Sequence, residues 1–191
     1  MRVLLHTCCG PCASACVPRL KAGGCEVAMF YSNSNLDTIE EFEKRREAAA
    51  KLSLADGVEL IVDDYDHDSW LKTVAAGLEN EPEKGARCAK CFRFSLARAA
   101  AYAAAHGYDG FASSLTVSPH KISAVVFGAG EAAAEMIRRT HPDGEAPEFL
   151  RYDFKKGEGF KLSVRRAREL GLYRQGYCGC EFSKRKGTEV C

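Results

Sequence analysis

The chain has 191 residues, with 27 lysines and arginines against 26 aspartates and glutamates, and ten cysteines. This length fits one domain with an apolar core. The composition excludes a collagen, a disordered tail and a membrane span, because no apolar run approaches the ~18 residues that a span needs. The first residues carry too short an apolar stretch for a secretory signal peptide. We therefore expect a cytoplasmic protein without a membrane anchor, whose cysteines serve as metal ligands or redox groups.

Strand and helix patterns alternate along the chain. Short apolar runs predict strands at 3–7, 27–31, 58–62 and 110–114. Helices are predicted at 11–22, from a cap at 37–40 to about 55, from 68 onward, and at 89–105. The alternation predicts an α/β fold with a mostly parallel sheet flanked by helices. Such sheets bind ligands at the carboxyl ends of their strands, where Cys8 and Cys9 follow the first strand.

A glycine pair at residues 128 and 130 resembles the glycine-rich turn of a dinucleotide-binding site. Gly128-Ala-Gly130 follows the apolar residues 124–127, which we interpret as a short strand. A dinucleotide site also needs an acidic residue ~20 positions later, and none stands there. We therefore expect no nicotinamide or flavin site at this place.

Basic residues gather toward the C-terminus. Residues 151–191 carry 11 basic and 5 acidic side chains, whereas residues 1–150 carry 16 basic and 21 acidic ones. Such a segment suits the phosphates of a nucleic acid, although a solvated charged surface would have the same composition. We treat residues 1–191 as one domain with a basic C-terminal segment from about residue 151.

The cysteines form three clusters. These are Cys8-Cys9 with Cys12 and Cys16, Cys88-Ala-Lys-Cys91, and Cys178-Gly-Cys180, whereas Cys25 and Cys191 stand alone. A C-x-x-C at a helix start lets two thiolates converge where the helix N-terminus favours negative charge. Four thiolates from two such places can hold an iron–sulfur cluster or a zinc ion, and the spacing does not choose between them.

Two of these clusters also have a redox interpretation. Cys9-Gly10-Pro11-Cys12 is a thioredoxin-like motif, typical of an enzyme that exchanges thiols and disulfides. Cys8 directly before it and the second C-x-x-C downstream have no role in that chemistry. Cys178 and Cys180 could close a small, labile disulfide ring if Gly179 supplies unusual backbone angles, or both could ligate a metal.

In this order the clusters resemble the QueH-type epoxyqueuosine reductases. The resemblance rests on the stretches 4–12, 85–92 and 172–180, with weaker matches at Ser118-Pro119-His120-Lys121 and Asp153-Phe154-Lys155-Lys156. It covers nearly the whole chain. Gly10 is a departure, since the family is expected to have alanine there. The family's fold is an α/β sandwich of the adenine-nucleotide α-hydrolase (HUP) type, which agrees with the alternation described above.

The resemblance implies an oxidoreductase that converts epoxyqueuosine to queuosine at the tRNA wobble position, the last step of queuosine biosynthesis. It implies that a [4Fe–4S] cluster is held by Cys8, Cys9, Cys88 and Cys91, and that Cys178 and Cys180 form the redox-active pair. Whether Cys12, Cys178 or Cys180 holds a second, single metal ion is left open. The partners would be tRNA carrying epoxyqueuosine and an electron donor that the sequence does not identify.

The remaining roles are assigned by position. The candidates for the general acid that protonates the leaving oxygen are Asp153, Lys155, Lys156 and Tyr177, and of these we expect Asp153. The tRNA backbone is expected to contact Lys155, Lys156, Lys161, Arg165, Arg166 and Arg168. Two other hypotheses stand beside this one: a thiol–disulfide oxidoreductase that uses Cys9 and Cys12, and an RNA-binding module held together by zinc.

Overall fold

The protein is built around a parallel sheet of five strands. The computed structural model describes residues 1–140 and 146–184. The strands are β1 (Arg2–Thr7), β2 (Glu26–Tyr31), β3 (Glu59–Val62), β4 (Gly110–Ser113) and β5 (Glu148–Phe149). Their order in the sheet is β3-β2-β1-β4-β5, and every pair is parallel. The predicted α/β class and mostly parallel sheet are confirmed.

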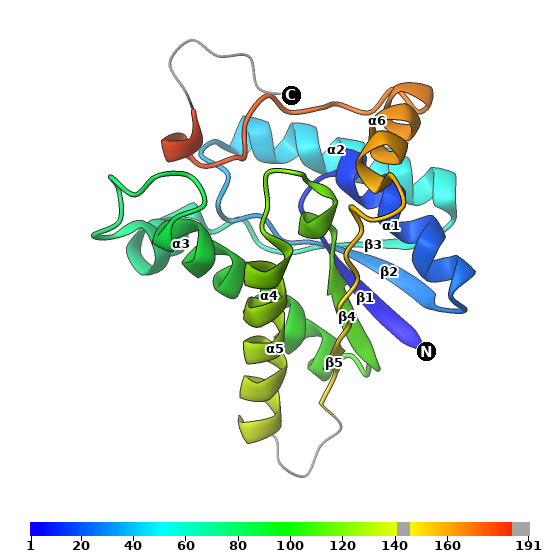
Figure 1. Cartoon of the computed structure of the whole chain (residues 1–191), viewed down its shortest axis with the longest axis horizontal. Coiled ribbons are helices and arrows are strands. Elements are labelled where there is room, and N and C mark those ends of the chain that lie inside the picture. Colours follow the sequence, from blue (N-terminus) through cyan, green and yellow to red (C-terminus); the bar gives the residue numbers. More distant parts are fainter. Residues whose placement is uncertain (141–145, 185–191) are drawn as a thin grey trace.

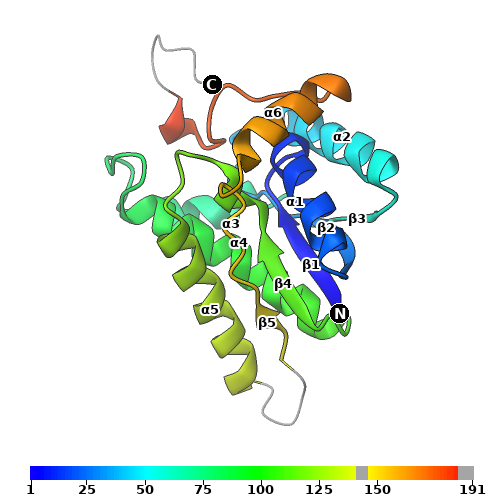
Figure 2. The same cartoon turned by 45° about the vertical axis from the view of Figure 1, so that its right-hand side comes forward.

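Helices cover both faces of the sheet (Figure 1). The long helices are α1 (Gly10–Ala22), α2 (Ile39–Asp56), α4 (Ala86–Ala105), α5 (Ser123–Thr140) and α6 (Gly159–Glu169). Shorter turns are α3 (His67–Trp70), the π-helical turn η1 (Leu71–Ala75), and the 3-10 turns η2 (Ser114–Val117) and η3 (Glu181–Ser183). Helices α1, α2 and α6 lie on one face, and α4 and α5 on the other (Figure 2).

The central strand β1 contributes side chains to two hydrophobic cores. Val3 and Leu5 pack with α1 and α2, whereas Leu4 points to the opposite face and packs with α4 and α5. All three side chains are fully buried. Because successive side chains of a strand alternate between faces, a strand covered on both sides must be apolar throughout. This is why the run at 3–5 could be predicted.

Four elements differ from the sequence expectation. Residues 124–127 belong to helix α5, so the strand expected there is wrong and Gly128 does not follow a strand. Inside this helix Gly130 lies against Phe149, where a Cβ atom would come within 2.3 Å of the ring. Helix α4 begins at Ala86, so Cys88 and Cys91 lie in its first turns. Strand β5 and helix α6 were not predicted, because β5 has only two residues and α6 is mostly polar.

Candidate active site

The cysteines after β1 lie at the point where the strand order of the sheet reverses. From β1 the chain continues to β2 and β3 on one side, and then crosses to β4 on the other. Open α/β sheets bind ligands at the carboxyl ends of the strands at such a point. Here the backbone N–H of Cys8 donates to Ser114 Oγ at 3.1 Å, and that hydroxyl donates to Cys8 Sγ at 3.3 Å. The expected position of Cys8 at this edge is confirmed.

Three sulfur atoms converge there. The Sγ atoms of Cys8, Cys9 and Cys12 all lie within 4.8 Å of one another. Cys9 is the N-cap of α1, and its sulfur accepts the backbone N–H of Cys12 at 3.4 Å. Hydrogen bonds from the Cys12 and Cys8 thiols lower the pKa of Cys9 well below its usual value, against the effect of burial. The group therefore offers three sulfur donors, of which Cys9 loses its proton most readily, and thiolates are the form in which cysteine binds a metal.

Gly10 explains how α1 can begin so close to α2. A Cβ atom at Gly10 would come within 2.5 Å of the Ala48 carbonyl oxygen. The alanine expected at this position in the family would therefore require α1 and α2 to separate. Glycine accordingly lets the first turn of α1, and with it Cys9 and Cys12, lie directly against α2.

A cavity of about 190 Å³ opens beside these sulfur atoms. Four cysteines from three separate parts of the chain line it, together with aromatic residues: Cys8, Cys12, Cys91, Cys178, Phe92, Phe160 and Tyr177. Cys88 lies next to this cavity, in a smaller pocket with Lys121, and its sulfur accepts the backbone N–H of Lys84 at 3.3 Å. The structure thus brings members of all three predicted cysteine clusters to this cavity or next to it. Among the described residues, however, only Cys8, Cys9 and Cys12 form a group whose sulfur atoms lie within 4.8 Å of one another, and Cys88 and Cys91 are not part of it.

A buried cation lies against Cys178. Lys121 Nζ donates to Cys178 Sγ at 2.7 Å, and its side chain is 10% exposed. Burial disfavours the ammonium group, but the negative charge of Cys178 outweighs it and raises the pKa of Lys121 above its usual value. Glu83 Oε1 lies 3.8 Å from the same ammonium group. The ammonium group of Lys121 thus holds Cys178 Sγ at the wall of the cavity.

Cys180 lies deeper than Cys178. It packs with Trp70, Val74 and Ala75, and Cys91 borders the same cluster. Burial raises the pKa of both Cys91 and Cys180, and the negative charge of Cys178 raises them further. Gly179 between the two cysteines has φ +142°, which is the backbone freedom expected of it. Cys178 therefore reaches the cavity, whereas Cys180 is held beneath it.

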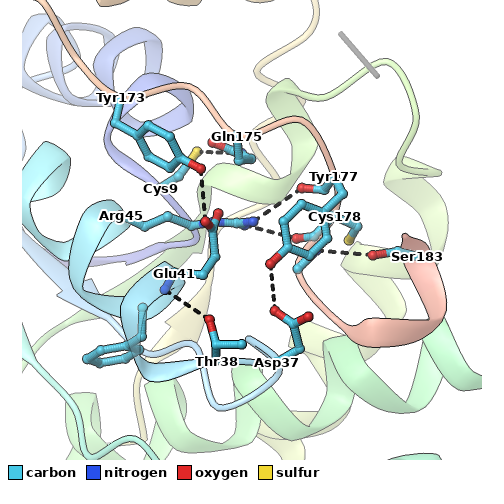
Figure 3. Close-up of polar contacts among 12 residues, drawn as sticks. Cys9, Asp37, Thr38, Glu41, Arg45, Tyr173, Gln175, Tyr177, Cys178 and Ser183 are labelled. Atoms are coloured by element: carbon cyan, nitrogen blue, oxygen red, sulfur yellow. Dashed lines mark hydrogen bonds and ion pairs between the residues drawn. The ribbon is translucent and has the colours of Figure 1, made fainter. Parts of the chain in front are cut away.

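The segment 173–178, which we call the strap, is anchored on α2 (Figure 3). Arg45 donates to the carbonyl oxygens of Tyr177 and Cys178 at 3.2 and 3.0 Å. Arg45 is itself paired with Glu41 at 2.7 Å, and Glu41 accepts the Tyr173 hydroxyl at 2.8 Å. These contacts carry the strap across the carboxyl end of the sheet, with Cys178 facing the cavity.

Comparison with known proteins agrees with this arrangement. The family model described as "Epoxyqueuosine reductase QueH" matches residues 3–186. The chain belongs to the QueH family. It is 33% identical over 184 residues to the epoxyqueuosine reductase QueH of Acinetobacter baylyi, covering 96% of this chain and 81% of that one. It is 34% identical over 184 residues to the QueH of Dehalococcoides mccartyi, covering 96% and 92%.

Two of the basic residues expected to contact tRNA make hydrogen bonds and ion pairs within this QueH protein. Lys155 Nζ donates to the carbonyl oxygens of Lys121 and Ser118 at 2.7 and 3.4 Å. Arg166 pairs with Asp56 at 2.5 Å and donates to the Ser14 carbonyl oxygen. Lys156 is exposed, as are three residues on one side of α6: Lys161, Arg165 and Arg168. Phe160 borders both this side of α6 and the cavity.

Asp153, the predicted general acid, lies outside the lining of the cavity. Asp153 Oδ1 accepts the Ser123 hydroxyl at 3.0 Å, and Asp153 is not among the residues that line the cavity. Its assignment as general acid stays a prediction. Cys25 lies between α1 and β2, and Cys191 falls outside the described residues.

Three site residues were not found from the sequence. Gln175 donates to Cys9 Sγ at 3.2 Å, and Arg45 and Lys121 contact Cys178 as described above. Lys121 and Gln175 stand inside stretches that carry the family resemblance, which was a usable indication. Arg45 had none, because it lies in a helix that the sequence shows only as charged. Within residues 1–140 and 146–184, none of the helices has the length and apolarity that crossing a membrane requires.

Proposed function

We propose that this chain reduces epoxyqueuosine in tRNA to queuosine. The reaction removes the epoxide oxygen as water and leaves an alkene, so it consumes two electrons and two protons. The observation that carries the proposal is the convergence of Cys8, Cys9 and Cys12 on a cavity that Cys91 and Cys178 also line, in a chain of the QueH family.

The proposed cofactor is a [4Fe–4S] cluster on Cys8, Cys9, Cys88 and Cys91. The donor chemistry supports it, because thiolates are the usual ligands of such clusters and the neighbouring thiols lower the pKa of Cys9. Cys12 lies in the same group of sulfur atoms, so we add it to the candidate ligands. When bound, the cluster would supply single electrons and Lewis acidity. The choice between a cluster and a single metal is decided by iron and sulfide content.

The chain's own residues would provide the rest of the chemistry. Cys178 and Cys180 would store two electrons as a dithiol and release them with two protons on forming a disulfide. Lys121 would hold the Cys178 sulfur in place beside the cavity. Phe92, Phe160 and Tyr177 offer aromatic faces on which a base can stack. The exposed basic side of α6 adjoins the cavity, so it would contact the phosphates of the bound tRNA.

The experiment is anaerobic purification followed by iron, sulfide and zinc analysis, and then an assay on tRNA carrying epoxyqueuosine. We expect about four iron and four sulfide per chain, and queuosine in the digested tRNA. Cys9→Ala should lose both the metal and the activity, whereas the control Cys25→Ala should keep both. Zinc without sulfide and without product would favour a zinc-held RNA-binding module. A metal-free chain that exchanges disulfides through Cys9 and Cys12 would favour the thioredoxin-like interpretation.

A further inference from the structure

One amide group reaches the buried sulfur of Cys9 from the strap. Gln175 Nε2 donates to Cys9 Sγ at 3.2 Å (Figure 3). The same sulfur accepts the backbone N–H of Cys12 at 3.4 Å, and Cys9 is fully buried. The hydrogen bond from Gln175 contributes to the lowered pKa of Cys9, after the larger effects of Cys12 and Cys8. A residue 166 positions away along the chain thus supplies a second N–H donor to one cysteine sulfur.

The hydrogen bond to Cys9 Sγ determines the orientation of the Gln175 amide. Gln175 Oε1 is buried and has no hydrogen-bond partner in the part of the chain that the structure describes. Turning the amide over would place this carbonyl oxygen, instead of an N–H donor, against the Cys9 sulfur. The N–H···S contact is therefore what fixes the amide.

The backbone on both sides of Gln175 is held independently of the amide. Tyr173 is tied to Glu41 by its hydroxyl, and Arg45 binds the carbonyl oxygens of Tyr177 and Cys178. The strap therefore keeps its position when the side chain of Gln175 is changed. The effect of the Gln175 amide on Cys9 and the effect of the backbone position of the strap can therefore be tested by different substitutions.

We infer that Gln175 is a positioning residue that acts through Cys9 and raises the reduction potential of the metal centre bound there. Hydrogen bonds to a ligand sulfur stabilise its negative charge, and the reduced state carries more of that charge than the oxidised state. Removing the donor should therefore make the centre harder to reduce. The inference rests on the proposed function, since it requires Cys9 to be a ligand of the cluster.

The test is a redox titration of the anaerobic holoenzyme, followed by the EPR signal of the reduced cluster. We expect a lower midpoint potential in Gln175→Leu, which has no N–H donor. Gln175→Met is also neutral, has no N–H donor and keeps the approximate length of the side chain. It should shift the potential in the same direction, and it tests the inference if the leucine variant loses its cluster. The control Tyr173→Phe removes a tether of the strap and should leave the potential at the wild-type value.

Two outcomes would overturn the inference alone: a wild-type potential in both Gln175 variants, or an equal shift in Tyr173→Phe, which would assign the effect to the strap. A wild-type protein without any iron–sulfur cluster would overturn the proposed cofactor, and this inference with it. A wrong cofactor assignment would show in the metal content of the wild-type chain, whereas a wrong inference about Gln175 would show only in the potentials of the variants. The two outcomes are therefore distinguishable.

Discussion

Arg45 on α2 and Cys178 on the strap are joined by a hydrogen bond of 3.0 Å from Nη1 to the backbone carbonyl oxygen. The two residues are 133 positions apart in the chain. The side chain of Arg45 is only 2% exposed, and its charge is balanced by Glu41 at 2.7 Å. A buried ion pair inside α2 therefore sets the backbone position of a predicted redox cysteine.

Replacing Arg45 with methionine should destabilise the protein strongly. The substitution leaves the Glu41 carboxylate buried without its partner, and a broken buried ion pair costs about 3–5 kcal/mol. It also releases the carbonyl oxygens of Tyr177 and Cys178. We expect the free energy of unfolding, measured by urea denaturation, to fall by this amount.

The matched control is Arg46→Met, one residue further along the same helix. Arg46 pairs with Glu43 at 2.6 Å, but the two side chains are 38% and 43% exposed. Exposed pairs of this kind contribute about 0–1 kcal/mol. Equal decreases in the two variants would show that the buried pair of Arg45 has no special role.

Gly179→Ala should disturb the predicted redox pair. Gly179 has φ +142°, and a Cβ atom there would come within 2.5 Å of Leu36 Cδ2 and 2.8 Å of Asn35 Nδ2. A residue other than glycine in this backbone region costs about 1–3 kcal/mol, and the close approach would displace Cys178 and Cys180 from their present positions. We expect lower queuosine formation with a normal metal content. Gly171→Ala, at φ +59° with open space around it, should keep full activity.

Charge reversal on α6 should weaken tRNA binding in a salt-dependent way. The triple variant Lys161→Glu, Arg165→Glu, Arg168→Glu removes the exposed basic side of α6 beside the cavity. For every tRNA phosphate that the variant no longer binds, the slope of log affinity against log salt should become flatter by about 0.7–0.9. The measurement is a binding isotherm at several salt concentrations.

The control for α6 lies at the other end of the molecule. Arg138 and Arg139 end α5 and are 52% and 78% exposed, far from α6 in Figure 2. The double variant Arg138→Glu, Arg139→Glu should keep the wild-type slope. An unchanged slope in the α6 variant would rule out that surface as the tRNA contact.

Stability of the metal-free, reduced protein should fall in mild acid because of His6. Burial lowers the pKa of His6 from 6.5 to about 4. Its Nε2 faces the Ser32 carbonyl oxygen at 3.3 Å and its Nδ1 faces Ser113 Oγ at 3.0 Å, so the neutral ring with a proton on Nε2 fits the site. The unfolded chain takes up the proton first as the pH falls. The stabilisation is therefore complete above about pH 6.5 and declines by about 3 kcal/mol toward pH 4.

The measurement for His6 is the free energy of unfolding against pH, in the wild type and in His6→Gln. The variant has no group that titrates at this position. Between pH 6.5 and 4 the slope of its free energy of unfolding against pH should therefore be smaller, by an amount that corresponds to the uptake of up to one proton. Parallel curves would contradict the prediction. The comparison of two curves removes the contribution of the carboxyl groups, which titrate in both proteins.

The local sequence determined the first half of the site. A short apolar strand, a cysteine pair and a helix with proline in its first turn are neighbours in the chain, so their geometry follows from adjacent residues. Periodicity likewise predicted the parallel sheet, and the order of the three cysteine clusters indicated the family. The expected strand at 124–127 failed because Val125, Val126 and Phe127 are apolar in α5 as well, and a short apolar run does not tell a strand from a buried helix.

Only the tertiary structure decided how the far end of the chain completes the site. Gln175 and Cys178 meet Cys9, Lys121 and Arg45 through contacts that span 57 to 166 positions, and no local pattern encodes them. Exposure was decided in the same way: Lys155 and Arg166 look like their neighbours in sequence, yet they satisfy carbonyl oxygens and a carboxylate inside the fold. Burial depends on what packs against a residue from elsewhere in the chain, and that is settled only when the sheet and its helices have assembled.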